Sequence, residues 1–496
     1  MIKLDINYYF IKSIFLKYST ILLCLLFFYS ISTHSQQLPN VQAESEIVET
    51  LNKSDDFIQH LSEAIQIKTI SYQNNSQINS ESFVALKENL IKNFPNVFKH
   101  LRQEKFSSNS ILLQWEGKNT ALKPILLMAH QDVVPAEDQK NKWKSPPFSG
   151  QIHVDHLYGR GALDDKSSLI GLLEATEYLV KKGFKPERTI YYVFGDDEEV
   201  GGNGAKEIAS WFIKNNINFE FILDEGPGIG IDVIDEVKRP IALIGVAEKG
   251  YASVELSVDQ ISGHSSMPPK KTAIGILSKA INNIEDHPFP ARYDGVIKML
   301  FDEIAPEMSF YKRFVFQHSS YFETLIKTKL ALNNSTNALI RTTSATTLFH
   351  SGEKENILPN QASAIINFRI LPGDSLEHIV PYINKVVNDS RVKIMFKGAA
   401  YNASPIADLN SIGYKLLTKS CKELYPEAIV APILVIGSTD SHHFTKTCNN
   451  ILRFIPMYFH KENLELIHGM DEEVNIKDYK KLILFYIRMM ENLNSF

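Results

Sequence analysis

The chain has 496 residues, of which 44% are hydrophobic and 22% are charged, and its formal net charge is −5. These values are typical of a folded protein that is too long for one compact core, and the length predicts about three domains. Nucleic acid is excluded as a partner, because binding to its phosphates needs clustered lysine and arginine and the chain has no long basic stretch.

The N-terminus has the composition of an export signal. Lys3, Lys12 and Lys17 precede a short apolar run, and small and polar residues follow it up to Ser35. This order is typical of a cleaved secretory signal, which we expect to occupy residues 1–35 and to direct the protein to a periplasmic or extracellular location. The alternative is an uncleaved membrane anchor, since apolar residues also precede the run. No later segment is apolar enough to span a bilayer.

Two cysteines follow the signal, Cys421 and Cys448. They lack the Cys-x-x-Cys spacing of metal ligands. They could pair in an oxidising compartment, but two cysteines in a chain of this size do not make a disulfide framework. We expect both to be structural.

From about residue 120 the chain alternates short apolar runs with helical patterns. Residues 125–129, 189–194 and 219–223 have the continuous apolar character of buried strands. Between the first two, residues 165–182 place leucines at helical spacing, and Gly183 ends the pattern. This order of strand, helix and strand predicts an α/β fold with a mainly parallel sheet covered by helices.

The pattern changes near residue 250. Residues 252–258, 362–370 and 392–396 alternate apolar and polar side chains, which is typical of a sheet with one face in water. Helical patterns occur between these strands, at 271–284 and 301–332.

These changes predict two domains after the signal. Residues 250–399 form a smaller α+β domain, to which the helical segment 301–332 belongs. It is inserted into a larger domain that consists of residues 45–249 and 400–496, where the sheet-forming pattern resumes.

Acidic residues and histidines cluster just after the predicted strands, where open α/β sheets hold their sites. In chain order, the clusters contain His130 and Asp132, Asp164 and Asp165, Asp196 to Glu199, Asp224 and Glu225, and His468 to Glu472. Two histidines with several carboxylates make a nitrogen and oxygen ligand set, which suits zinc. No EF-hand spacing is present, so calcium is not expected.

Each cluster also has an ordinary explanation. His130 and Asp132 could be a surface pair, Asp164 a helix cap, and the acidic run 196–199 a solvated loop. The acidic run is the most informative, because four adjacent carboxylates repel one another unless they are solvated or bound to cations. It directly follows an apolar strand at the expected edge of the sheet, so we favour metal binding.

In this order the clusters resemble the co-catalytic zinc peptidases of family M20, which include acetylornithine deacetylase, succinyl-diaminopimelate desuccinylase, aminoacylase and carboxypeptidase S. The resemblance extends from about residue 56 to the C-terminus. It is most specific in residues 130–135, 159–166 and 197–202. The carboxypeptidase S subgroup is indicated by residues 341–347, 354–359, 367–373 and 437–441.

The resemblance implies two zinc ions per chain. It assigns His130 and Asp224 to one zinc, Glu199 and His468 to the other, and Asp164 to both. A cis peptide bond is expected between Asp164 and Asp165. Glu198 would be the general base, and Asp132 would accept the second imidazole N–H of His130.

The resemblance also implies a ferredoxin-like fold for the inserted domain, which would act as a lid or a dimerisation domain. His264 would stabilise the oxyanion, in some members from across a homodimer. The substrate carboxylate would be held by Asn356, Arg369 and the loop Gly437, Ser438 and Thr439. Arginine suits this role because its planar fork pairs with a carboxylate through two hydrogen bonds.

Three positions depart from the subgroup. Asp196 stands where histidine is usual, Ser438 replaces a usual glycine, and His442 replaces a usual arginine. All the expected ligands and the base are present, so these departures concern substrate preference.

Together these residues predict a hydrolase that cleaves the amide bond before an amino acid with a free carboxylate. A water held between two zinc ions is largely hydroxide near neutral pH, and Glu198 would take its proton and pass it to the leaving nitrogen. Cobalt or manganese could occupy the same ligands. A carboxypeptidase acting on small peptides is the main expectation, and an N-acyl amino acid hydrolase is the alternative. A non-catalytic solute-binding protein is disfavoured, because no part of the site is missing.

Overall fold

The computed structural model describes residues 56–73, 79–136, 142–460 and 465–496. The expected export signal, residues 1–35, lies outside these residues. Within them, no helix combines the length and the apolar character that crossing a bilayer requires.

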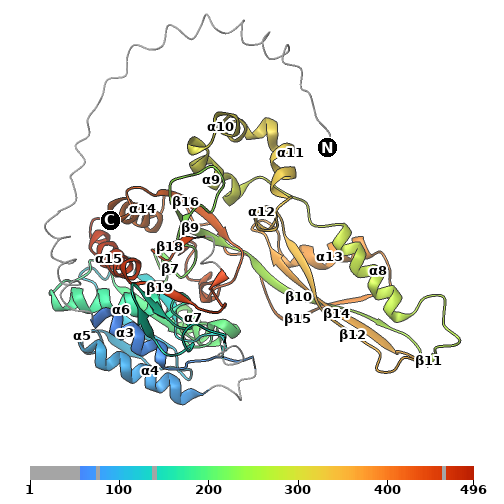
Figure 1. Ribbon diagram of the computed structural model, residues 1–496, viewed down its shortest axis with the longest axis horizontal. Coiled ribbons are helices and arrows are strands. Elements are labelled where there is room, and N and C mark those ends of the chain that lie inside the picture. Colours follow the sequence, from blue (N-terminus) through green and yellow to red (C-terminus); the bar gives the residue numbers. More distant parts are fainter. Residues whose placement is uncertain (1–55, 74–78, 137–141, 461–464) are drawn as a thin grey trace, which may run out of the picture. The chain divides into compact units, whose positions relative to one another are not determined.

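Ten strands among the described residues form one mixed sheet (Figure 1). Their order is β1-β2-β6-β3-β7-β17-β9-β8-β18, and β16 also pairs with β9. The strands β6, β3, β7 and β17 run parallel, whereas β1 and β2 at one edge are antiparallel. The bounds are β1 Arg102–Glu104, β2 Ile111–Trp115, β3 Ile125–His130, β6 Ile190–Gly195, β7 Ile222–Asp224, β8 Ile229–Ile231, β9 Ile241–Glu248, β16 Ile429–Val435, β17 Ile451–Arg453 and β18 Tyr458–His460. The predicted mainly parallel α/β fold is confirmed.

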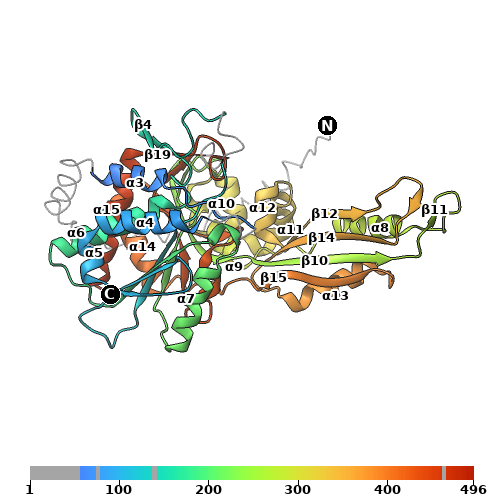
Figure 2. The same cartoon turned by 90° about the horizontal axis from the view of Figure 1, so that it is seen from below.

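Both faces of the central strands are buried, which explains their continuous apolar sequences. Alternate residues of β3 point to opposite faces: Leu127 belongs to a core shared with α6 and α15, whereas Leu126 and Met128 pack with α7. Figure 2 shows α7 apart from the larger group of helices. The helices of this domain are α3 Asp56–Gln66, α4 Ser80–Asn93, α5 Pro95–His100, α6 Lys166–Lys181, α7 Asn203–Lys214, α14 Ile412–Leu424 and α15 Ile476–Leu493.

A separate four-stranded antiparallel sheet has the order β12-β14-β10-β15. The apolar residues of its alternating strands form a second core with two helices, α8 and α13. The bounds are β10 Gly250–Asp259, α8 Ala273–Asp286, β12 Thr343–Ser351, β14 Gln361–Ile370, α13 Leu376–Val387 and β15 Lys393–Tyr401. The sheet therefore begins and ends within about two residues of the predicted insert, 250–399.

The helical character predicted for residues 301–332 is confirmed, but these helices do not pack on the four-stranded sheet. Their apolar residues form a core with Ile241 of β9 and Ala431 of β16, in the large sheet. This cluster contains α9 Gly295–Ile304, α10 Phe310–Gln317, α11 Ser319–Leu330 and α12 Asn334–Ile340. A periodic pattern reveals the apolar face of a helix but not the sheet that covers it.

The remaining elements are short. They comprise β4 Gln151–His153, β5 His156–Tyr158 and β19 Glu473–Asn475, which form a small sheet, the pair β11 Gly263–His264 and β13 Ile357–Leu358, and the 3₁₀ turns η3 Glu198–Val200, η4 Ala305–Glu307 and η5 Asp440–Phe444.

Candidate active site

The predicted clusters meet because their strands are parallel neighbours. His130 is the last residue of β3 and pairs with Gly195, the last residue of β6, while β7 ends at Asp224 on the other side of β3. The carboxyl ends of parallel strands lie at one edge of a sheet, so the residues after them share that edge. Three sets of side chains there bring ligand atoms within 4.8 Å of one another: His130, Asp164 and Glu225; His130, Glu198 and Glu199; and Asp164, Glu199 and His468.

Asp164 lies between the two histidines. Its Oδ1 is 2.8 Å from His130 Nε2, and its Oδ2 is 3.1 Å from His468 Nε2. The second histidine also lies 3.0 Å from Glu199 Oε2. The peptide bond between Asp164 and Asp165 is cis, as expected from the resemblance. One carboxylate oxygen thus faces each histidine, which is the arrangement that a residue shared by two metal ions requires.

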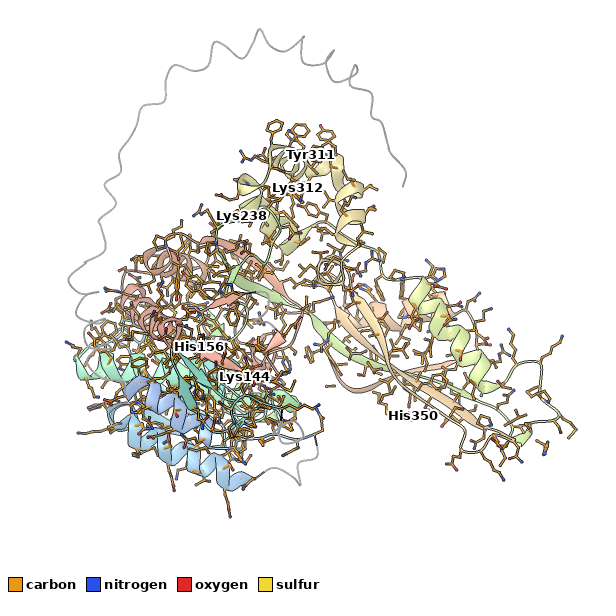
Figure 3. The ribbon with its side chains drawn as sticks, viewed as in Figure 1. Lys144, His156, Lys238, Tyr311, Lys312 and His350 are labelled. Atoms are coloured by element: carbon orange, nitrogen blue, oxygen red, sulfur yellow. The ribbon has the colours of Figure 1, made fainter. Side chains whose placement is uncertain are left out.

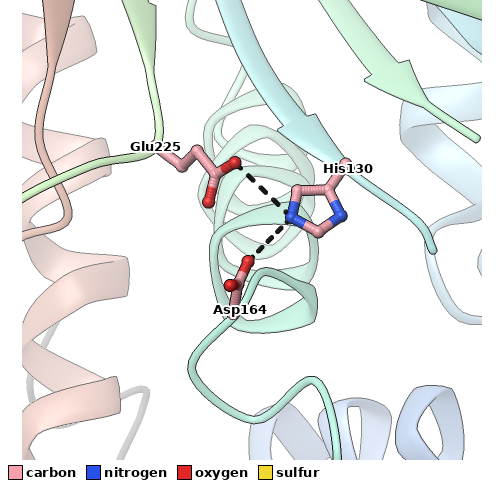
Figure 4. A group of neighbouring side chains, drawn as sticks. All are labelled: His130, Asp164 and Glu225. Carbon is pink, nitrogen blue, oxygen red and sulfur yellow. Dashed lines mark hydrogen bonds and ion pairs between the residues drawn. The ribbon is translucent and has the colours of Figure 1, made fainter. Parts of the chain in front are cut away.

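The resemblance assigns Asp224 as the ligand after β7, and this assignment stays a prediction. In the structure the carboxylate of its neighbour Glu225 lies within the cluster. Glu225 Oε1 lies 3.5 Å from His130 Nε2 (Figure 4). The carboxylate of Asp224 is buried and accepts the backbone N–H of Ser441 at 3.0 Å and that of Glu225 at 3.0 Å. Asp224 therefore supports the loop after β16, and Glu225 faces the cluster.

Asp132 organises the turn that carries Glu198 and Glu199. Its Oδ1 accepts the backbone N–H of Glu198 at 3.1 Å, and its Oδ2 accepts that of Glu199 at 3.2 Å. His130 Nδ1 lies 3.0 Å from the backbone oxygen of Asp132 and 3.3 Å from its carboxylate. The expected pairing of Asp132 with His130 is present, and the same carboxylate also positions the two glutamates.

The electrostatics of the cluster favour a cation. Burial raises the pKa of Glu198 well above its ordinary value, and the nearby Glu225 raises it further. Burial and the charge of Asp164 also raise the pKa of Glu225 well above its ordinary value, although the nearby His130 lowers it. Burial alone lowers the pKa of His130, but Glu225, Asp132 and Asp164 outweigh it, so the net shift is upward. Carboxylates crowded in this way are stable together when a positive charge lies between them.

The donor set fits two metal ions. His130 and Glu225 flank one oxygen of Asp164, while His468 and Glu199 flank the other. Imidazole nitrogens and carboxylate oxygens in this number suit zinc and its divalent neighbours. Asp165, by contrast, is buried with neither carboxylate oxygen hydrogen-bonded among the described residues, and burial raises its pKa.

A cleft of about 2080 Å³ adjoins this cluster, and Asp164, Glu198, Glu199, Glu225 and His468 line one part of it. The predicted carboxylate-binding residues Arg369, Gly437, Ser438 and Thr439 line the same cleft. The Nη1 atom of Arg369 is buried and has no hydrogen-bond partner in the described part of the chain. An unpaired guanidinium N–H group on a residue that lines the cleft is suited to a substrate carboxylate.

Two predicted residues do not join this site. His264 is exposed in β11, and Asn356 precedes β13, which pairs with β11. The backbone oxygen of Asn356 accepts the N–H of Ser265, so the two lie together. Neither residue lines the cleft.

The sequence did not single out Glu248 or Tyr401. Glu248 Oε2 accepts the N–H of Thr439 at 3.1 Å and pairs with Arg453 at 2.9 Å, in a fully buried position. Tyr401 bonds to Ser438 through its hydroxyl and stacks on His442, with 4.1 Å between ring centroids. These two residues shape the loop around Ser438, and only their position in the fold reveals it.

Comparison with known proteins gives a consistent result. The model of the family described as Peptidase family M20/M25/M40 matches residues 126–492. The chain is 40% identical over 446 residues to the probable carboxypeptidase S-like 2 of Dictyostelium discoideum. This match covers 89% of this chain and 86% of that protein. It is 36% identical over 438 residues to the N-fatty-acyl-amino acid synthase/hydrolase PM20D1 of Homo sapiens. This match covers 87% of this chain and 86% of that protein.

A solved structure has the same fold. It is an M20 family metallo-carboxypeptidase from Sulfolobus solfataricus, with a TM-score of 0.65 and 22% sequence identity. The match covers 89% of this chain and 100% of that chain. At this identity the likeness supports the architecture of the fold alone.

Proposed function

We propose that this chain, which belongs to peptidase family M20/M25/M40 and is a hydrolytic enzyme, removes long apolar acyl groups from the nitrogen of amino acids. The amide bond to be cut is the one before an amino acid with a free carboxylate. This bond occurs both in N-acyl amino acids and at the C-terminal end of small peptides. The two substrate classes differ in the group on the other side of the amide, which is a hydrocarbon chain in the first and a peptide in the second.

Two zinc ions would be held by His130, Glu225 and Asp164 on one side, and by His468, Glu199 and Asp164 on the other. When bound, they lower the pKa of a water molecule and polarise the amide carbonyl. The support for this assignment is the distances between these side chains and the raised pKa values of the buried carboxylates.

The side chains of the protein would transfer the proton, bind the substrate carboxylate and position the base. Glu198 accepts the proton of the attacking water and returns it to the leaving nitrogen, a role worth about 10²–10⁴ in rate. Arg369 and the loop 437–439 hold the carboxylate of the amino acid. Asp132 keeps Glu198 in place through the backbone N–H bond described above.

The observation that carries the proposal is the apolar extension of the cleft. From the acidic cluster the cleft continues between the helices α9 to α12 and β16. Its lining there is aliphatic and aromatic and includes Leu243, Ile297, Leu300, Phe301, Met308, Val315, Phe316, Leu325, Ile326, Leu330 and Ile433. Burial of a CH₂ group contributes about 0.8 kcal/mol, so this lining favours a long hydrocarbon chain over a short polar peptide.

A carboxypeptidase acting on small peptides is the second candidate. The relative from Dictyostelium discoideum, 40% identical, is named a probable carboxypeptidase S-like protein. Both reactions need the same metal ligands, the same base and the same carboxylate site.

Two further expectations form part of this proposal. Because His264 and Asn356 lie outside the cleft, we propose that they act from a second copy of the chain in a homodimer, as the family resemblance implies. The composition of residues 1–35 supports export or membrane anchoring of the protein.

The test is a substrate panel with the purified metal-loaded protein. Released amino acid is measured for one amino acid carrying acetyl, octanoyl or oleoyl groups, and for dipeptides with the same C-terminal residue, with and without chelator. We expect kcat/KM to rise with acyl length, by about 15-fold or less for every two methylenes. Chelator should abolish release, and zinc should restore it. Faster release from the dipeptides than from every acyl amino acid would favour the carboxypeptidase.

A matched pair of variants locates the effect in the cleft. Leu325 lines the apolar extension and is 40% exposed, whereas Ile261 is 91% exposed and does not line the cleft. Leu325→Ser should lower kcat/KM for the oleoyl substrate and leave the acetyl substrate unchanged. Ile261→Ser should change neither.

A further inference from the structure

The helices α10 and α11 carry both buried and exposed apolar residues. Val315, Ile326 and Leu330 are buried in the core shared with β9 and β16. Four aromatic residues of these helices are exposed: Phe310 is 80% exposed, Tyr311 68%, Phe314 44% and Tyr321 86%. We call these four residues the aromatic patch. Scattered single apolar residues on a surface are ordinary, whereas four exposed aromatic residues on two consecutive helices are a reason to look for a binding surface.

The segment that carries the aromatic patch is rich in basic side chains, of which Lys312 pairs with Glu236 and Lys327 with Glu323, each at 2.9 Å. Residues 309–332 contain four basic side chains, Lys312, Arg313, Lys327 and Lys329, against one acidic side chain, Glu323, which is a net charge of +3. The whole chain has a net charge of −5, so this segment differs in sign from the rest of the protein. Figure 3 labels Tyr311 and Lys312 near the top of this helical cluster, and Lys238, from the segment between β8 and β9, below them in the view.

The cleft reaches the surface beside the aromatic patch. Tyr311, Lys312 and Lys329 line the cleft and are also partly or largely exposed. The same cleft contains Glu198 and His468. A long hydrocarbon chain could therefore enter between these helices and extend towards the amide-cleaving groups.

We propose that the aromatic patch and its basic surroundings dock on the surface of an anionic lipid bilayer, so that the cleft opens towards the lipid. Aromatic rings with lysine and arginine at their edge are the composition of protein surfaces that insert into the headgroup region. Lysine is depleted in interfaces between proteins, which favours the lipid surface over a protein partner. The inference rests on the proposed function, because long-chain acyl amino acids partition into bilayers.

The first experiment detects docking without turnover. The full chain carries an environment-sensitive fluorophore on a cysteine at position 321 or, as control, at position 261, both in a Cys24→Ser background; Cys421 and Cys448 are buried. Position 261 is an apolar residue of similar exposure, 91%, outside the aromatic patch. The probes are vesicles of phosphatidylcholine with or without phosphatidylglycerol.

The expected result is a blue shift at position 321 with anionic vesicles, a smaller shift with phosphatidylcholine alone, and no shift at position 261. Lys329→Gln should weaken the partition constant roughly fivefold or less, and added salt should weaken it further. No shift at 321, or equal shifts at both positions, would overturn the proposal. If the patch binds a protein instead of a lipid surface, no shift is expected at position 321, because the vesicles contain no protein.

The second experiment connects docking to catalysis. Phe310 and Tyr321 are exposed and do not line the cleft. The double variant Phe310→Ser/Tyr321→Ser should raise KM for an oleoyl substrate held in anionic vesicles at least fivefold, and leave kcat/KM for a soluble acetyl substrate unchanged. An unchanged KM for the vesicle-borne substrate would refute the role of the patch in substrate capture. If the position 321 probe shifts but no acyl substrate is cleaved, the surface proposal stands and the proposed function fails.

Discussion

Arg160 and Glu472 form a buried ion pair, with 2.6 Å between Arg160 Nη1 and Glu472 Oε2. Glu472 also accepts the backbone N–H of Asp164 at 3.1 Å, and Arg160 Nη2 donates to the backbone oxygen of His468 at 3.1 Å. The pair therefore joins the loop that carries Asp164 to the loop that carries His468. The positions of Asp164 and His468 thus depend on a group of contacts centred on two residues that lie 312 positions apart in the sequence.

Replacing Arg160 by methionine should damage both stability and metal retention. The substitution leaves Glu472 buried without its cation, and removing one partner of a buried pair costs about 3–5 kcal/mol. Urea unfolding should show a loss of this size, and metal analysis after dialysis should show less bound zinc. The exposed pair of Arg239 and Glu307 provides the control: Arg239→Met should cost about 1 kcal/mol or less. Equal losses in the two variants would contradict the role of Arg160.

Glu198→Gln should separate chemistry from binding. The amide keeps the shape of the side chain but cannot accept a proton, so kcat should fall by about 10²–10⁴. KM and metal content should stay close to those of the unaltered protein. Steady-state kinetics and elemental analysis on one preparation measure all three. Unchanged turnover would remove Glu198 as the base.

Glu225→Gln and Asp224→Asn distinguish the two acidic residues after β7. Glu225 faces the cluster, so its substitution should lower the metal content from about two ions to about one. Asp224→Asn should retain both ions, but it should also lower stability, because the single amide oxygen can accept only one of the two backbone N–H groups, of Glu225 and of Ser441, that the carboxylate accepts. Elemental analysis of both variants decides the assignment. The opposite pattern would identify Asp224 as the ligand.

Mixing two inactive variants should restore activity if the site is shared between copies. Glu198→Gln lacks the base, and His264→Ala lacks the expected oxyanion donor. A mixed dimer would contain one site with both groups intact, so the mixture should regain up to about one quarter of the unaltered turnover. This estimate assumes random exchange of copies and two sites per dimer. Turnover of the mixture equal to the mean of the separate variants would indicate that each chain works alone.

Lys249 gives the stability a defined pH dependence. Burial lowers its pKa to about 7, and its Nζ donates to the backbone oxygens of Ala338 and Arg341. In the unfolded chain the pKa is about 10.4. Between these values the unfolded chain binds more protons, so the contribution of Lys249 to stability rises with pH.

The stability of the unaltered protein relative to Lys249→Met should therefore increase from pH 7 to pH 10, by at most about 1.4 kcal/mol per pH unit. Urea unfolding of both proteins across this window measures the difference. Lys118→Met, which removes an exposed lysine, should give a nearly constant difference. A constant or falling difference for Lys249→Met would contradict the lowered pKa.

The amino-acid pattern alone determined the location of most of the site. Buried parallel strands have continuous apolar sequences that end at polar residues, and parallel strands align those ends at one edge. This pattern placed His130 and the acidic run 196–199 at one edge of the sheet, whereas the assignment of Asp164, Glu199 and His468 to the same cluster came from the family resemblance. The alternating sequences between 250 and 401 likewise revealed a second sheet with one wet face.

Other features depended on the tertiary structure, because they arise from contacts that no local pattern encodes. Asp224 and Glu225 are chemically alike and adjacent, and only the path of the backbone after β7 turns one towards His130 and the other towards Ser441. The helices α9 to α12 have an ordinary amphipathic pattern, which does not specify that they cover β9 and β16. A sequence pattern indicates which side chains avoid water, whereas the packing of distant segments decides which of them meet.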